Sequence, residues 1–163
     1  MTESLLREKI NNLILLYKRG LNKEARIEAQ MLIRNNPNSF FLHNILGMIN
    51  IGLKKWDESI RSLSRAIEIK KDYSEAHNNL GVAFNNSGHL EKAVECYLKA
   101  IKFKPNYANA HNNLGSVFND LGRWEEAAES YSKALEFDPK NNEAYDNLIK
   151  LLTFYKPKKT NSN

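Results

Sequence analysis

Apolar residues recur three and four positions apart in short segments along most of the chain, which is the pattern of amphipathic helices. Two such segments lie between Ser74 and Pro105 and are separated by Gly88. Their apolar positions are Ala76, Leu80, Ala83 and Phe84 in the first, and Ala93, Tyr97, Ala100 and Ile101 in the second. Pro105 ends the second segment because proline fixes φ and has no N–H to donate. The pattern predicts two helices joined by a tight turn.

This pair of segments is repeated. The sequence HNNLG occurs at residues 77–81 and again at 111–115, 34 positions later, and residues 74–107 and 108–141 are identical at 17 of 34 positions. A fixed period of 34 residues is typical of a helix-turn-helix unit that stacks on copies of itself. The sequence therefore predicts an array of helix pairs.

The repeated residues resemble the tetratricopeptide repeat (TPR) family. The matching positions are Leu80–Gly81 and Leu114–Gly115, Phe84 and Phe118, Gly88 and Gly122, Ala93 and Ala127, Tyr97 and Tyr131, Ala100 and Ala134, and Pro105 and Pro139. The resemblance implies an all-α fold, a right-handed α-solenoid of antiparallel helix pairs. We expect Gly81 and Ala93 to lie where the two helices of a unit cross, because a larger side chain would push the backbones apart.

We expect one solenoid over residues 1–155. Its repeats are predicted at about 6–39, 40–73, 74–107 and 108–141, followed by a capping helix at 142–155 and a disordered tail at 156–163. The first repeat has Leu13 in place of the glycine and Ala29 in place of the tyrosine, which we interpret as a large-for-small exchange. In the second repeat, Lys54 occupies the position of the turn glycine.

Composition changes this picture little. The chain has 163 residues, of which 42% are apolar, enough for four or five stacked units. Its net charge of +5 is concentrated in residues 1–73, where 13 Lys and Arg face 8 Asp and Glu. Basic and acidic residues alternate along the predicted helices, and the aromatic residues fall on core positions, so we expect no nucleic-acid partner. No apolar run is long enough for a membrane span, and the charged N-terminus is unlike a signal peptide; we expect a cytoplasmic protein.

The resemblance implies that the first helices of successive units line an inner, concave wall. The predicted peptide-binding residues on that wall are the asparagines Asn44, Asn78, Asn79, Asn85, Asn112, Asn113, Asn119 and Asn147. An asparagine side chain offers an acceptor and two donors, which match the C=O and N–H of a peptide backbone. This ladder is similar to the one in the TPR region of O-linked N-acetylglucosamine transferase. The alternative is that Asn79, Asn113 and Asn147 bond to neighbouring helices.

The N-terminal half of the same wall is apolar. Its predicted groove residues are Ile14, Phe41, Ile45, Met48 and Ile51. An exposed apolar groove is usually covered by a partner. Alternatively, these residues close against each other where the first repeat meets the second. The third and fourth repeats carry no Lys or Arg in the groove columns, which argues against the family's carboxylate-clamp receptors for chaperone tails.

Two further features are candidates for chemistry. His43, His77 and His111 recur with the repeat, but zinc ligands must converge within roughly 2 Å of one ion, so packing is favoured over metal binding. Cys96 is the single cysteine and has no neighbouring ligand, so we interpret it as a packing residue. We expect no metal, cofactor or catalytic site.

These observations predict a non-catalytic scaffold that binds an extended peptide or partner segment in its concave groove. Two alternatives stay open. The chain could be the N-terminal TPR module of a larger enzyme, such as a glycosyltransferase, sulfotransferase or oxygenase. It could also be a self-assembling TPR scaffold, and a homo-oligomer is then expected.

Overall fold

A computed structural model describes residues 3–155, which form helices and turns without a strand. The helices are α1 (Glu3–Lys18), α2 (Asn22–Asn35), α3 (Phe40–Gly52), α4 (Trp56–Ile69), α5 (Ser74–Asn86), α6 (Leu90–Phe103), α7 (Ala108–Asp120), α8 (Trp124–Phe137) and α9 (Asn142–Phe154). The tail predicted to be disordered, residues 156–163, lies outside the described residues. No helix in residues 3–155 is long and apolar enough to cross a membrane.

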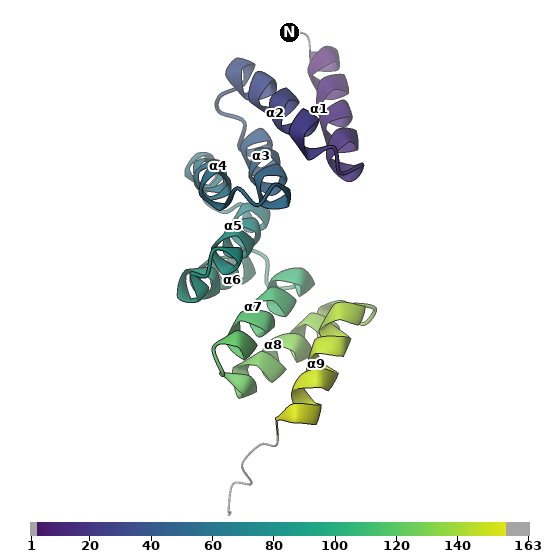
Figure 1. Ribbon diagram of the computed structural model, residues 1–163, viewed down its shortest axis with the longest axis vertical. Coiled ribbons are helices and arrows are strands. Elements are labelled where there is room, and N and C mark those ends of the chain that lie inside the picture. The colour runs from purple at the N-terminus through teal and green to yellow at the C-terminus, as the bar shows by residue number, and fades with distance from the viewer. Residues whose placement is uncertain (1–2, 156–163) are drawn as a thin grey trace, which may run out of the picture.

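The helices stack as consecutive antiparallel pairs in an elongated array, with α1 at one end and α9 at the other (Figure 1). Within the array, α3 packs on α4, α5 on α6 and α7 on α8, and each second helix also packs on the first helix of the next pair. First helices of neighbouring pairs touch as well, for example α5 and α7. The predicted all-α solenoid of about four repeats plus a C-terminal helix is confirmed.

Glycine allows the tight turn inside the first, third and fourth pairs. Gly20, Gly88 and Gly122 have φ values of 73°, 82° and 71°. This left-handed region is open to glycine because glycine lacks a Cβ. Lys54 occupies the same position in the second pair with φ 56°. The second repeat therefore carries a non-glycine residue in an unfavourable backbone conformation.

A second glycine lets the two helices of a pair approach. A Cβ built on Gly81 would lie 2.6 Å from Cε1 of Tyr97, and its three nearest atoms all belong to that ring. Gly81 on α5 therefore lies against α6, and the ring of Tyr97 fills the space at this crossing. In the first pair, Leu13 and Ala29 are both fully buried in one apolar cluster. This packing agrees with the predicted large-for-small exchange.

The core is a strip that runs along the stack. Its largest cluster, formed by α6, α7 and α8, includes Leu151 from α9. Other apolar residues of α9 are exposed, namely Tyr145, Ile149, Leu152 and Phe154. One side of α9 thus closes the stack, and the opposite side is open.

Candidate binding wall and C-terminal pocket

The asparagines of successive first helices are hydrogen-bonded in pairs. Nδ2 of Asn79 donates to Oδ1 of Asn44 at 3.0 Å. Nδ2 of Asn113 donates to Oδ1 of Asn78 at 3.0 Å. Nδ2 of Asn147 donates to Oδ1 of Asn112 at 3.3 Å. The ladder therefore ties α3 to α5, α5 to α7 and α7 to α9.

The acceptors of these pairs are buried. Asn44, Asn78 and Asn112 are 4%, 6% and 3% exposed. The prediction that these three residues contact a peptide was wrong, because the next first helix covers them. Asn79, Asn113 and Asn147 each bond to a neighbouring first helix, as the alternative interpretation of these three residues expected.

The donors of these pairs keep capacity for a ligand. Asn79, Asn113 and Asn147 are half-buried, and each spends one of its two N–H hydrogens in the pair. Within residues 3–155, the Oδ1 atoms of Asn113 and Asn147 accept no hydrogen bond. The assignment of these three residues to a peptide site stays a prediction.

The two remaining predicted binding residues, Asn85 and Asn119, are not used in hydrogen bonds between the described helices. Asn85 is half-buried and Asn119 is exposed. Neither side chain makes a hydrogen bond within the part of the chain that the structure describes. Both amides can therefore meet a ligand without breaking an internal contact, and their role also stays a prediction.

The predicted apolar groove is largely closed. Ile45 is buried in the cluster that contains Leu13 and Leu42, and Ile14 packs against that cluster. Ile45 is therefore a core residue, and its prediction as a groove residue was wrong. Met48 and Ile51 are half-buried, and Phe41 is 36% exposed. This end of the wall offers a ligand little apolar surface beyond Phe41.

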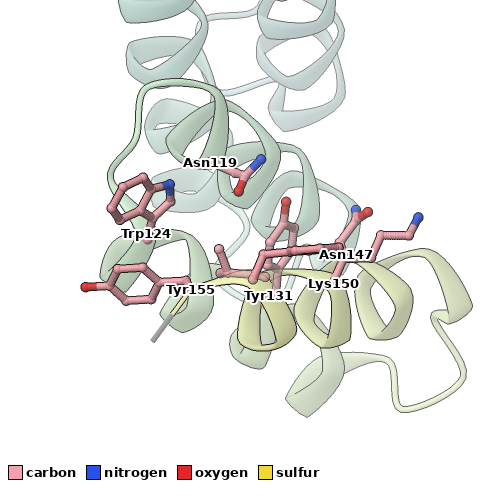
Figure 2. A pocket seen from close by; sticks show the side chains of 8 residues that line it. Asn119, Trp124, Tyr131, Asn147, Lys150 and Tyr155 are labelled. Atoms are coloured by element: carbon pink, nitrogen blue, oxygen red, sulfur yellow. The ribbon is translucent and has the colours of Figure 1, made fainter. Parts of the chain in front are cut away.

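A pocket opens at the opposite end of the wall, where α9 meets the last pair. It has a volume of about 430 Å³ and is lined by Asn119, Trp124, Tyr131, Asn147, Lys150, Leu151, Phe154 and Tyr155. Figure 2 shows Asn119 from α7 and Tyr131 from α8 near the centre of the pocket, and Asn147 and Lys150 from α9 on the right. Trp124 and Tyr155 lie on the left. Two of the predicted asparagines, Asn119 and Asn147, thus meet here.

The pocket combines polar groups with an aromatic wall. The rings of Trp124 and Tyr155 lie 4.7 Å apart at 44°. The hydroxyl of Tyr131 donates to Oγ of Ser116 at 3.3 Å, and burial raises the pKa of Tyr131, so the hydroxyl stays protonated. Lys150 is exposed and has no ion pair within residues 3–155. The pocket can receive a large apolar side chain beside an acidic group.

Sequence reasoning missed most of this pocket, although one signal was available. Lys150 lies 34 positions after Ser116 and so extends the column of Met48, Val82 and Ser116. Extending that column onto the capping helix would have identified Lys150 as a residue of the binding wall. By the same spacing, Phe154 and Tyr155 correspond to Asp120 and Leu121, so they could have been found in the same way.

The repeated histidines have a structural explanation. Nε2 of His43, His77 and His111 lies 2.9 Å from the carbonyl oxygens of Pro37, Lys71 and Pro105, respectively. A carbonyl only accepts, so each ring donates from Nε2 and ties its helix to the loop before it. His77 also stacks on Phe103 with ring centroids 5.4 Å apart. The three histidines therefore pack and hydrogen-bond within the fold.

Cys96 is buried in the core cluster formed with Leu63, Leu80 and Ala83. Burial raises the pKa of its thiol to about 11. Because the thiolate is the nucleophilic form, this cysteine is poorly suited to covalent chemistry.

With this geometry, the family can be assigned. A model described as TPR repeat matches residues 53–88 and 83–122, and one described as tetratricopeptide repeat matches residues 108–141. The chain belongs to the tetratricopeptide repeat family. No curated protein matches it.

Solved structures agree on the fold. MamA is 26% identical with a TM-score of 0.74, over 85% of this chain and 81% of that one. TTC0263, a thermophilic TPR protein of Thermus thermophilus, is 20% identical with a TM-score of 0.79, over 86% and 78%. The first TPR of Spaghetti (RPAP3), solved with the HSP90 peptide SRMEEVD, is 22% identical with a TM-score of 0.68, over 70% and 90%.

Proposed function

We propose that this protein is a non-catalytic interaction scaffold that holds an extended peptide segment of a partner along α3, α5, α7 and α9. The observation that carries the proposal is the row of half-buried amides of Asn79, Asn113 and Asn147, one repeat apart, each with an N–H left over. Such a row suits the regularly spaced polar groups of an extended backbone. The similar RPAP3 domain holds a peptide in its solved structure, which supports the same kind of ligand here.

The buried asparagines support this proposal indirectly. Each of them fixes the side chain that faces the groove through a hydrogen bond of 3.0 to 3.3 Å. A side chain that is already ordered avoids an entropy cost of about 0.5–1.5 kcal/mol on binding. The ladder is thus prepared for a ligand before the ligand arrives.

The C-terminal pocket would add selectivity to this backbone recognition. We infer that it takes a large apolar or aromatic side chain against Trp124 and Phe154. An acidic group next to that side chain would reach the ammonium of Lys150. The expected ligand is therefore an extended segment that has an apolar residue flanked by Asp, Glu or a terminal carboxylate.

Selection from a random-peptide phage library would test the proposal. Wild-type protein should enrich peptides with an apolar residue next to an acidic one. The double variant Asn119→Ala/Lys150→Ala should lose that enrichment, because both side chains line the pocket and both are exposed, so the fold is preserved. Lys140→Ala, an exposed change in the loop before α9, is the matched control. The role of the pocket is contradicted if the double variant selects the same peptides as wild type, and the proposal of peptide binding fails if wild type enriches no peptide.

A second candidate function is self-association, and one observation favours it. Tyr145, Ile149 and Leu152 of α9 occupy the repeat positions of His111, Gly115 and Phe118. In α7 that side packs on α8, with the rings of His111 and Phe137 5.4 Å apart. The same side of α9 is exposed and could receive a second copy. Light scattering that finds only monomer at high concentration, for wild type and Leu152→Glu alike, would exclude it.

A further inference from the structure

The second helices of neighbouring repeats enclose a groove that occurs twice in the chain. One groove lies between α2 and α4 and has a volume of about 430 Å³; the other lies between α6 and α8 and has about 400 Å³. Their residues correspond at a spacing of two repeats. The apolar floor is Ile33 and Leu46 in the first, and Ile101 and Leu114 in the second.

The two grooves differ in charge. The first is lined by Arg34, Arg61 and Arg65 and by no carboxylate. In the second, the position of Arg61 is taken by Glu129, and Glu126 also lines the groove. The first groove is therefore strongly basic, whereas the equivalent second groove has both basic and acidic side chains.

The positive charge of the first groove is only partly compensated. Glu58, one helical turn before Arg61 on α4, attracts that guanidinium without forming an ion pair with it. Arg34 and Arg61 have no ion pair within residues 3–155, whereas Arg65 pairs with Glu68 at 2.9 Å. In the second groove, Arg123 pairs with Glu126 at 2.5 Å and Lys133 with Glu136 at 2.8 Å. The first groove thus has two guanidinium groups free for an external anion.

We propose that the groove between α2 and α4 is a second binding site, which takes an acidic peptide segment of a partner protein. Carboxylates of the segment pair with Arg34 and Arg61, since the planar guanidinium matches a carboxylate in a two-point contact. An apolar side chain of the segment rests on Ile33 and Leu46. The site lies between two second helices, with His43 and Leu46 of α3 also in its lining. None of its lining residues belongs to the asparagine ladder, and the site does not depend on the function proposed above.

The lining favours a peptide over other anions. Free phosphate would leave the apolar floor unused. Single-stranded nucleic acid needs aromatic rings on which its bases can stack. The one ring in this lining, His43, is held by its hydrogen bond to the carbonyl of Pro37 at 2.9 Å.

Fluorescence anisotropy with a labelled peptide of alternating glutamate and leucine tests the site. The reference protein is the variant Asn119→Ala/Lys150→Ala, in which the C-terminal pocket, whose proposed ligand is similar, no longer contributes. It should bind the peptide, and binding should weaken as salt is added, because salt screens exposed charges. Arg61→Glu should weaken binding more than about tenfold, since a hydrogen bond to a charged group is lost and a like charge is introduced. Arg61→Gln removes only the contact and should weaken binding about tenfold.

The matched control is Lys133→Glu in the second groove, which changes the net charge by the same amount as Arg61→Glu. Made in the same Asn119→Ala/Lys150→Ala background, it should bind the peptide like that reference protein. Equal loss in Lys133→Glu and Arg61→Glu would overturn the proposal, because attraction would then follow net charge and not a site. Tighter binding of labelled oligothymidylate, with the same dependence on Arg61, would also overturn it.

Discussion

Asn113 on α7 donates a hydrogen bond from Nδ2 to Oδ1 of Asn78 on α5, 3.0 Å away. The acceptor belongs to a side chain that is 6% exposed, so water has little access to replace the donor. A buried acceptor that loses its donor pays its full desolvation penalty. The asparagine ladder therefore stabilises the stack whether or not a partner is bound.

Replacing Asn113 with alanine is expected to lower the free energy of unfolding by about 1–3 kcal/mol, because Oδ1 of Asn78 loses its donor. Urea denaturation measures this change. The control is Asn119→Ala, an exposed amide, which should change stability by less than about 0.5 kcal/mol. Equal stabilities of the two variants would contradict a structural role for the pair.

The packing of Gly81 against Tyr97 leads to a second prediction. Gly81→Ala places a Cβ 2.6 Å from Cε1 of the ring, so ring or helix must shift. Overpacking of this kind costs about 1–3 kcal/mol. Replacing glycine by alanine inside a helix gains about 1 kcal/mol in helix propensity, so we expect a net loss of stability. Thermal unfolding should show a lower melting temperature for this variant.

The first repeat suggests how to rescue such a change. It places Leu13 at the glycine position and Ala29 at the tyrosine position, and both are fully buried. The double variant Gly81→Leu/Tyr97→Ala copies that arrangement and should be more stable than the sum of its two single changes predicts. Additive losses would mean that the exchange depends on other residues of the first repeat.

Local features made the fold predictable from the sequence. The 34-residue period, the turn position of Gly88 and the helix-ending Pro105 each act within one repeat, so single residues indicate where helices begin and end. The exchange of Leu13 for glycine was also visible, because the repeats can be aligned with each other.

The state of the asparagines was not predictable in the same way. Asn78 and Asn79 are adjacent and chemically identical, yet the first is buried and the second is half-buried. Neighbouring residues point about 100° apart on a helix, and only the position of the next repeat decides which one is covered. The closure of Ile45 into the core has the same origin, because it depends on how the first pair leans on the second.

Lys54 provides a prediction with the opposite sign. Its φ of 56° lies in the left-handed region, where an L-residue with a Cβ costs about 1–2 kcal/mol. Lys54→Gly should therefore raise the free energy of unfolding by up to about 1 kcal/mol, since part of the relief is lost to the greater freedom of the unfolded chain. Lys54→Ala keeps the Cβ and should give no gain. A destabilised glycine variant in urea denaturation would show that Lys54 makes a compensating contact.

His77 should make stability depend on pH. Burial lowers the pKa of its imidazole, against a smaller opposing effect of the hydrogen bond to the carbonyl of Lys71. The folded state therefore binds a proton less readily than the unfolded state, whose histidine pKa is about 6.5. The stabilisation by neutral His77 is present above that pH and is lost as the pH falls through the lowered folded-state pKa.

Unfolding of wild type and His77→Gln at about pH 7.5 and about pH 5 measures this effect. Glutamine keeps an N–H that can donate to the carbonyl of Lys71 but does not titrate, so the variant should lose less stability on acidification than wild type. The difference between the two proteins isolates His77, because every other titrating group is common to both. If both proteins lose the same free energy of unfolding, protonation of His77 does not oppose folding, and its burial beside Phe103 tolerates the charge.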